Sequence, residues 1–295
     1  MVASLAFAAS PALANAKVCR SQEQRFEQIE RDPTSIEINA ALFSAADKGC
    51  TDLARKLLDK GASLDARDRL GAKPLARAAV AGEVEVVTLF LDRGAPIDAQ
   101  NLEGSSALYQ AAENGRLPVV RLLVERGANV SLPGRTGTTP LSAAAYMGSV
   151  PIIELLMQKG ADPKTVDTTG KTAIVYAAGR GFPAVVRLLL DHGVDVNARY
   201  GNDLTALMWA AGYSDEAGVK DALEVLSMLL DKGAHIDDAD NRGRTALMIA
   251  AELNHASAVD FLLAHGADKS LKDKQGKRAS DLTTLTALRD KLAGG

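Results

Sequence analysis

Few residues of this chain have the types and spacing that catalysis or metal binding requires. The glycine-rich stretch at 134–139 is like a phosphate-binding loop, but it lacks the lysine and the spacing of such loops. Two of the four histidines, His192 and His265, precede equivalent glycines two repeat units apart and cannot share a metal ion. No Ser/His/Asp or Cys/His set stands out. We therefore expect no catalytic residue, no metal site, no cofactor and no enzyme activity.

The first sixteen residues have the pattern of a secretory signal peptide. They carry no charge, an apolar block over 2–9 is broken by Pro11, and Ala14-Asn15-Ala16 fits a small-residue cleavage site. The first basic residue is Lys17, so the positively charged start is truncated. The alternative is an alanine-rich N-terminus without a targeting role. We expect an exported protein, located in a bacterial periplasm or secreted.

The two cysteines, Cys19 and Cys50, depend on that compartment for their chemistry. In a reducing cytosol they would be unrelated thiols, whereas after export they can form a disulfide. Their number and spacing do not fit a zinc site. We predict a Cys19–Cys50 disulfide that ties the N-terminal segment to the first repeat.

The overall composition limits the classes of partner. The chain has 295 residues, of which 47% are apolar and 24% charged, and a formal net charge of −3. A chain with this charge offers no general basic field for nucleic acid. No apolar run approaches the roughly 18–20 residues that span a bilayer. We expect neither nucleic-acid binding nor a membrane span.

The chain repeats itself with a fixed period. Each leucine-rich segment is followed by two residues, then by a glycine, and then by alanine or valine. Successive glycines of this kind are 33 residues apart, except for one interval of 40. They are Gly61, Gly94, Gly127, Gly160, Gly193, Gly233 and Gly266. Such a period indicates a stacked array in which each unit packs against its neighbours.

Each unit carries the signals of two short helices. A turn such as Asp167–Lys171 precedes a Ser or Thr that suits a helix N-cap. Two adjacent alanines mark the first helix, which glycine, or asparagine at Asn254, ends by adopting the left-handed conformation. The second helix has an apolar face, as at Val119–Val124, and ends at the marker glycine. The predicted N-caps are Ser106, Thr139, Thr172, Thr205 and Thr245.

This pattern resembles the ankyrin repeat family, most clearly over 137–163 and 243–273. The resemblance implies an all-α solenoid of stacked helix–turn–helix units with short β-hairpin-like turns, and a function in binding other proteins. The family's Thr-Pro-Leu-His histidine is absent from every unit. We expect apolar packing to replace it at several positions.

The repeats divide the chain into four parts. We assign residues 1–16 to the signal peptide, 17–38 to an N-terminal capping segment, and 39–273 to seven repeats. Residues 274–295 hold a partial eighth repeat and a capping helix.

Both ends have cap-like patterns. Phe26 and Ile29 predict a short amphipathic helix that stops near Pro33. At the other end, leucines recur every three or four residues, which predicts one apolar stripe on a last helix. They are Leu282, Leu285, Leu288 and Leu292.

The long interval places seven extra residues within 213–221 of the sixth repeat. Seven residues make about two helical turns, so we expect the second helix to begin earlier. Asp215 and Glu216 would precede it, with Val219, Leu223, Leu226 and Leu230 on one face. The extension is either growth that the stack tolerates or a rim that contacts the partner.

In an ankyrin-like stack, the turns and the exposed face of the first helices line a concave groove, where the resemblance places partner contacts. Tyrosine and arginine are frequent anchors of protein interfaces. We call the equivalent position in each repeat a slot. Tyr176 and Trp209 share one slot, whose side chain usually packs in the interior of an ankyrin-like stack. The predicted partner-binding residues are Arg135, Tyr146, Met147, Lys171, Arg180, Tyr213, Arg242 and Arg244.

These patterns favour a monomeric, non-enzymatic scaffold that binds a partner protein. One alternative is an effector secreted to a foreign host, which would use the same mechanism. Another is a ligand-binding or catalytic accessory subunit, which would need a clustered polar pocket.

Overall fold

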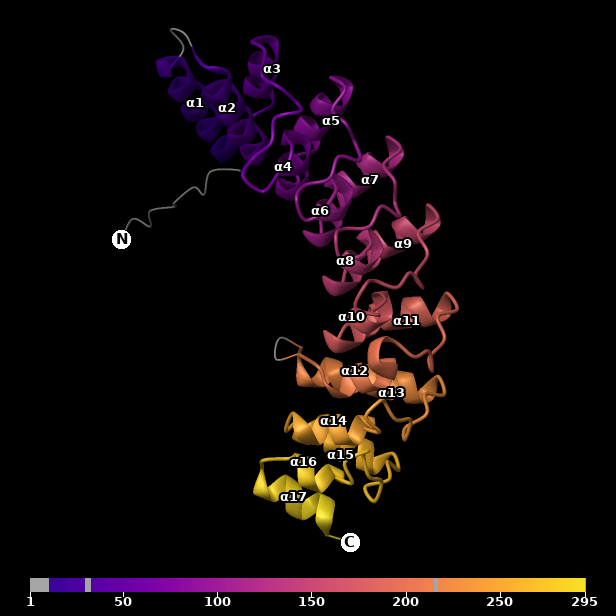
Figure 1. Cartoon of the computed structure of the whole chain (residues 1–295). Helices are drawn as coiled ribbons and strands as arrows, with labels where there is room; N and C mark the ends of the chain where they lie inside the picture. Colours follow the sequence, from indigo (N-terminus) through magenta and orange to yellow (C-terminus); the bar gives the residue numbers. More distant parts are fainter. Residues whose placement is uncertain (1–10, 30–32, 215–216, 295) are drawn as a thin grey trace, which may run out of the picture. The chain divides into compact units, whose positions relative to one another are not determined.

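The computed structural model describes residues 11–29, 33–214 and 217–294, which belong to two compact units, 1–135 and 136–295. The regular structure of the described residues is helical, and their one β-type pairing is an isolated bridge between Tyr200 and Leu204 (Figure 1). No helix in this part of the chain is long and apolar enough to cross a membrane. The predicted all-α repeat fold is confirmed.

The first unit stacks three helix pairs behind an N-terminal helix. The first helices of the pairs, α2, α4 and α6, pack in one row, and the second helices, α3, α5 and α7, pack in another (Figure 1). The helices are α1 (Pro11–Ile29), α2 (Ser35–Lys48), α3 (Thr51–Asp59), α4 (Pro74–Ala81), α5 (Val84–Asp92), α6 (Ala107–Glu113) and α7 (Leu117–Glu125).

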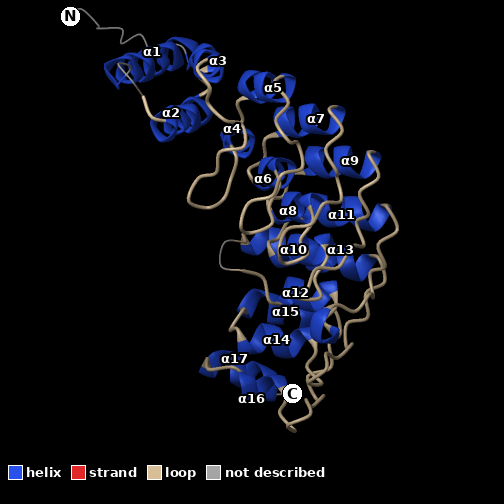
Figure 2. Cartoon of the chain, turned by 45° about the horizontal axis from the view of Figure 1, so that its top comes forward, coloured by secondary structure: helices blue, strands red, loops and turns tan. Residues whose placement is uncertain are grey.

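Within the second unit, the helices also form two rows, and α8, α10, α12, α14 and α16 make up one of them (Figure 2). A 3-10 turn, η1 (Gly201–Asp203), precedes α12. The helices are α8 (Pro140–Tyr146), α9 (Val150–Gln158), α10 (Ala173–Gly179), α11 (Pro183–Asp191), α12 (Ala206–Ala211), α13 (Val219–Asp231), α14 (Ala246–Glu252), α15 (Ala256–Ala264), α16 (Ala279–Leu282) and α17 (Thr286–Ala293).

Carboxylates and amides of the turns hold the first helices in place. The Asp167 carboxylate accepts the backbone N–H groups of Thr169 and Lys171 at 2.8 and 3.0 Å. Asp68 does the same for its own turn, at 2.9 Å to each N–H group. These bonds satisfy donors that a sharp turn would leave unpaired.

Predicted caps are found at most of the positions expected. The hydroxyls of Ser106, Thr139, Thr205 and Thr245 each accept a backbone N–H of the following helix. Thr172 occupies the predicted N-cap position of α10, but its hydroxyl accepts no backbone N–H of that helix, so the predicted capping bond is wrong. Asn254 ends α14 with a φ of 60°, the left-handed conformation that its residue type allows.

The N-terminal helix α1 is longer than predicted. Its 19 residues include Ala16, where we expected cleavage, and it buries Phe26. The predicted disulfide joins Cys19 of α1 to Cys50, which directly precedes α3. This bond and the contacts of α1 with α2 and α3 attach the helix to the first pair.

The C-terminal leucines do not share one helix. Thr283 accepts the Leu285 N–H at 3.2 Å and donates to the Asn254 side chain at 2.8 Å, and these bonds separate α16 from α17. Leu288 and Leu292 are buried on α17, whereas Leu285 is 47% exposed. The prediction of one apolar stripe is therefore wrong.

The long repeat lengthens its second helix, as expected. Helix α13 has 13 residues where α11 has nine. Its buried face differs from the predicted one: Val219 is 46% exposed, and the buried residues are Ala222, Val225, Leu226, Met228 and Leu229. The prediction for Asp215 and Glu216 lies outside the described residues.

Candidate partner-binding surface

An aromatic pocket of about 200 Å³ lies on the first-helix row of the second unit. Side chains and glycines from three consecutive repeats line it, together with the turn before α10 and the residue that follows Tyr213. We call it the aromatic pocket. Its lining residues are Tyr146, Lys171, Val175, Tyr176, Gly179, Arg180, Trp209, Gly212 and Ser214.

One edge of the aromatic pocket is a stacked pair of side chains. The Arg180 guanidinium lies 4.4 Å from the Tyr146 ring centroid, and its Nη1 donates to the Tyr146 hydroxyl at 3.2 Å. Arg180 also lies 5.8 Å from the Phe182 ring. Such cation–π contacts hold a cation while leaving much of the ring accessible. Tyr146 is 43% exposed and can therefore contact a partner.

A second cation occupies the middle of the aromatic pocket. The Lys171 ammonium lies 5.0 Å from the Trp209 ring centroid and 5.6 Å from that of Tyr176. The Tyr176 and Tyr146 rings meet edge to face at 6.1 Å and 84°. Three aromatic rings and two cations from successive repeats thus form one continuous surface.

Asp167 anchors this arrangement from its turn. Its carboxylate accepts hydrogen bonds from the Tyr176 hydroxyl and from the Thr169 hydroxyl. Burial alone would raise the pKa of Asp167, but the hydrogen bonds from Tyr176, Lys171 and Thr169 together lower it below its ordinary value. The carboxylate is therefore charged at neutral pH and holds the Tyr176 ring in position.

Two glycines keep the aromatic pocket open. Gly179 and Gly212 directly follow the double alanines of their repeats, where other repeats have Val80, Glu113 or Glu252. A side chain at Gly179 would pack against Trp209, since its Cβ would lie 3.7 Å from Cε3.

Two polar atoms of this lining have no hydrogen-bond partner in the described part of the chain. They are Nε1 of Trp209 and the hydroxyl oxygen of Ser214, both shielded from solvent. Unpaired buried donors of this kind are uncommon and costly. Both atoms lie in the wall of the aromatic pocket, where they are not accessible from solvent.

The structure brings together three of the predicted site residues, Tyr146, Lys171 and Arg180. Met147 is 44% exposed beside Tyr146 but does not line the aromatic pocket. Tyr213 is a correction, because we predicted it in the groove and it is only 9% exposed. Its ring stacks on His255 at 4.1 Å.

The three other predicted arginines lie elsewhere. Arg135 belongs to the first unit, where its backbone N–H donates to Glu103. Arg242 is exposed on a turn. Arg244 is committed internally, with ion pairs to Asp240 at 2.9 Å and Glu252 at 2.6 Å. These contacts make Arg244 a structural residue and remove it from the exposed set that we predicted.

Sequence reasoning missed part of the lining. It assigned Tyr176 and Trp209 to the core, and both are partly exposed on the pocket instead. The sequence signal was the glycine at 179, because it removes a side chain that would lie beside the Trp209 ring.

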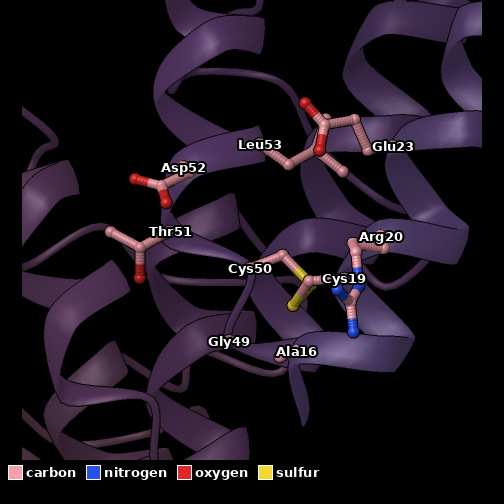
Figure 3. Close-up of a pocket in the computed structure, with 9 residues that line it drawn as sticks. All are labelled: Ala16, Cys19, Arg20, Glu23, Gly49, Cys50, Thr51, Asp52 and Leu53. Carbon is pink, nitrogen blue, oxygen red and sulfur yellow. A yellow bond between two sulfur atoms is a disulfide. The ribbon is translucent and has the colours of Figure 1, made fainter. Parts of the chain in front are cut away.

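A second hollow, of about 470 Å³, lies over the disulfide in the first unit. Figure 3 shows Arg20 and Glu23 extending from α1 and Asp52 from α3 around the joined sulfurs of Cys19 and Cys50. This lining contains no aromatic residue, and its charged side chains include both basic and acidic groups. Arg20 is the one residue of this lining that is of a type frequent among interface anchors, and no aromatic ring accompanies it.

The histidines fit structural roles. The Nδ1 atoms of His192 and His265 each lie 2.8 Å from the carbonyl oxygen four residues earlier. Among the described residues, no group of three His, Cys, Asp or Glu side chains could hold a metal ion.

Comparison with known families agrees with the helix pairs. A family model described as "Ankyrin repeats (3 copies)" matches residues 24–101, 94–167, 159–221 and 202–273. These matches cover most of the chain and include every residue that lines the aromatic pocket. The chain belongs to the ankyrin repeat family, whose stacked repeats are protein-interaction scaffolds.

Proposed function

We propose that this protein binds a partner protein on the first-helix row of its second unit, with the aromatic pocket at the centre of the contact. The observation that carries the proposal is the cluster of Tyr146, Tyr176 and Trp209 with Lys171 and Arg180 stacked on their rings. Aromatic residues and arginine supply large contact area at low conformational cost, and they dominate measured interface hot spots.

The lining favours binding over catalysis. Asp167, the carboxylate that the described residues bring to Tyr176, already accepts bonds from Tyr176, Thr169 and two backbone N–H groups, so it is not available as a general base. The side chains that line the pocket itself are three aromatic rings, the basic groups of Lys171 and Arg180, Val175 and the Ser214 hydroxyl. A surface of this kind recognises a partner without changing it chemically.

We further propose that binding takes place in an exported compartment, a bacterial periplasm or the extracellular space. The Cys19–Cys50 disulfide supports this setting, because structural disulfides persist where the environment is oxidising. The proposed surface on the second unit would bind in the same way to a partner from the producing cell or to one from a host.

The test begins with fractionation of the producing cells, to find the compartment and its soluble proteins. The full chain then serves as bait for cross-linking in that fraction. Tyr146→Ala should weaken capture at least tenfold, as expected for a hot-spot aromatic. Glu113→Ala is the matched control, because Glu113 occupies the Tyr146 slot in the first unit. Equal capture by both variants and the wild type would disprove the proposed surface.

A further inference from the structure

We infer that the aromatic pocket accepts one large apolar side chain carried on an acidic segment of the partner. This inference rests on the proposed function and specifies the chemistry of the partner. The size of the aromatic pocket, its two glycines and the contacts of its polar and charged groups support it.

The size of the aromatic pocket indicates a single side chain. At about 200 Å³ it is smaller than the roughly 300–1,000 Å³ of small-molecule sites. Val175 and the Trp209 ring contribute apolar lining, and Gly179 and Gly212 leave space beside them. The free energy of filling such a space comes from apolar burial. A leucine or an aromatic side chain of the partner meets both requirements.

The polar groups of the lining require acceptors from the partner. Trp209 Nε1 is a donor only, and it has no partner within the described ranges. Lys171 can also only donate, and its ammonium contacts no carboxylate among the described residues. Because Trp209 Nε1 is shielded from solvent, the requirement for an acceptor from the partner rests on Lys171, and negative charge is the best match for its ammonium.

Lys171 differs from the basic residues of the second unit that form ion pairs. Lys232 pairs with Asp191 at 2.8 Å, and Lys291 pairs with Asp260 at 2.6 Å. Lys171 instead lies over two rings, where the cation keeps its charge available to an incoming carboxylate. A basic partner segment would be repelled, and a bare anion would leave the apolar lining uncovered.

Trp209 is the only tryptophan of the chain, so its emission reports on the aromatic pocket directly. The probe is a capped seven-residue peptide with leucine at its centre and three acidic residues on each side. One comparison peptide replaces leucine with alanine, and the other replaces the acidic residues with lysine. We expect a saturable emission change with the first peptide and at least tenfold weaker binding of the other two.

A pocket-filling variant provides the second arm. The Cβ that Gly179→Leu introduces meets Trp209 at an ordinary contact distance of 3.7 Å, and the variant should weaken binding of the acidic leucine peptide at least tenfold. Val80→Leu is the control, because Val80 holds the equivalent slot in the first unit. Circular dichroism of both variants establishes that they remain folded.

Quenching of Trp209 emission by iodide and by caesium measures the electrostatic potential around Trp209 in the absence of a peptide. Iodide should quench more strongly than caesium, and Lys171→Met should reduce that preference. No saturable response to the acidic leucine peptide up to millimolar concentration would overturn the inference. Equal binding of the three peptides, or a saturable response to a single-stranded oligonucleotide instead of them, would overturn it also. If capture still depends on Tyr146 in that case, the inference fails while the proposed function stands.

Discussion

The two units place different side chains in the same repeat slots. The slot that holds Tyr176 and Trp209 in the second unit holds Arg77 and Gln110 in the first. Arg77 is tied up in a two-pronged contact with Asp47, at 2.8 and 2.7 Å. One scaffold thus presents a closed ionic surface in one unit and an open aromatic surface in the other.

The electrostatic surroundings of the two first-helix rows also differ. In the first unit, burial together with the nearby Glu113 and Glu103 raises the pKa of Tyr109 to about 12. In the second unit, the rings lie beside Lys171 and Arg180. The comparison teaches that the repeat pattern sets the positions of the slots, whereas the residues placed in them decide which stretch can bind.

The largest expected effect concerns the disulfide, which only the first unit has. Reduction, or the Cys19→Ser/Cys50→Ser double variant, should cost about 3–4 kcal/mol by the chain-entropy account of a loop of this length. Hydrogen exchange should rise in α1 and α3 and stay unchanged in the second unit. A rise of equal size in both units would show that the disulfide does not act locally.

The next effect compares two turn carboxylates. Asp68→Ala and Asp167→Ala each leave two backbone N–H groups unpaired, and each should cost about 2 kcal/mol in denaturant unfolding. Only Asp167 also binds the Tyr176 hydroxyl, so only its variant should weaken partner capture. Loss of capture in both variants would mean that the binding surface is not confined to the second unit.

The Asp167 carboxylate also predicts a pH dependence. Its folded-state pKa lies below the ordinary value of 3.8, so it stabilises the fold above that pH. This contribution is lost as the pH falls through 3.8 towards the lower folded-state pKa. The difference in melting temperature between the wild type and Asp167→Asn should therefore shrink between pH 6 and pH 3. A constant difference would assign the effect to packing.

The repeat fold could be predicted because it depends on local signals. Marker glycines, caps and alanine pairs recur at fixed spacing, and each has a local physical cause. The C-terminal break could not be predicted, since the Thr283 bond to Asn254 joins residues 29 positions apart. Leucine periodicity carries no information about such a tertiary bond.

The aromatic pocket was predicted in part, for a similar reason. Exposure of Tyr146 follows from its own slot, but exposure of Trp209 follows from the absence of a side chain at Gly179, one repeat away. The prediction for Tyr213 has the opposite error: we expected it to be exposed, but His255 of the next repeat covers its ring. The repeat pattern gives the usual exposure of each slot, but it does not include the particular side chains that the adjacent repeats place beside it.

The smallest expected effect concerns the extension of the sixth repeat, which has no counterpart in the first unit. Deleting Ser214–Lys220 removes the bond from the Ser214 N–H to the Gly179 carbonyl, which measures 2.8 Å. It leaves the buried face from Ala222 onward intact. We expect unchanged helicity per residue and a cost of about 1 kcal/mol.

Ser214→Ala is the matched control for that deletion, because it keeps the backbone bond and removes only the hydroxyl that lines the aromatic pocket. If the deletion abolishes capture while Ser214→Ala does not, the extension itself contacts the partner. If both variants weaken capture slightly and equally, only the pocket hydroxyl matters. Loss of cooperative unfolding in the deletion variant would instead show that the second unit needs the longer helix to stack, and that the extension is structural.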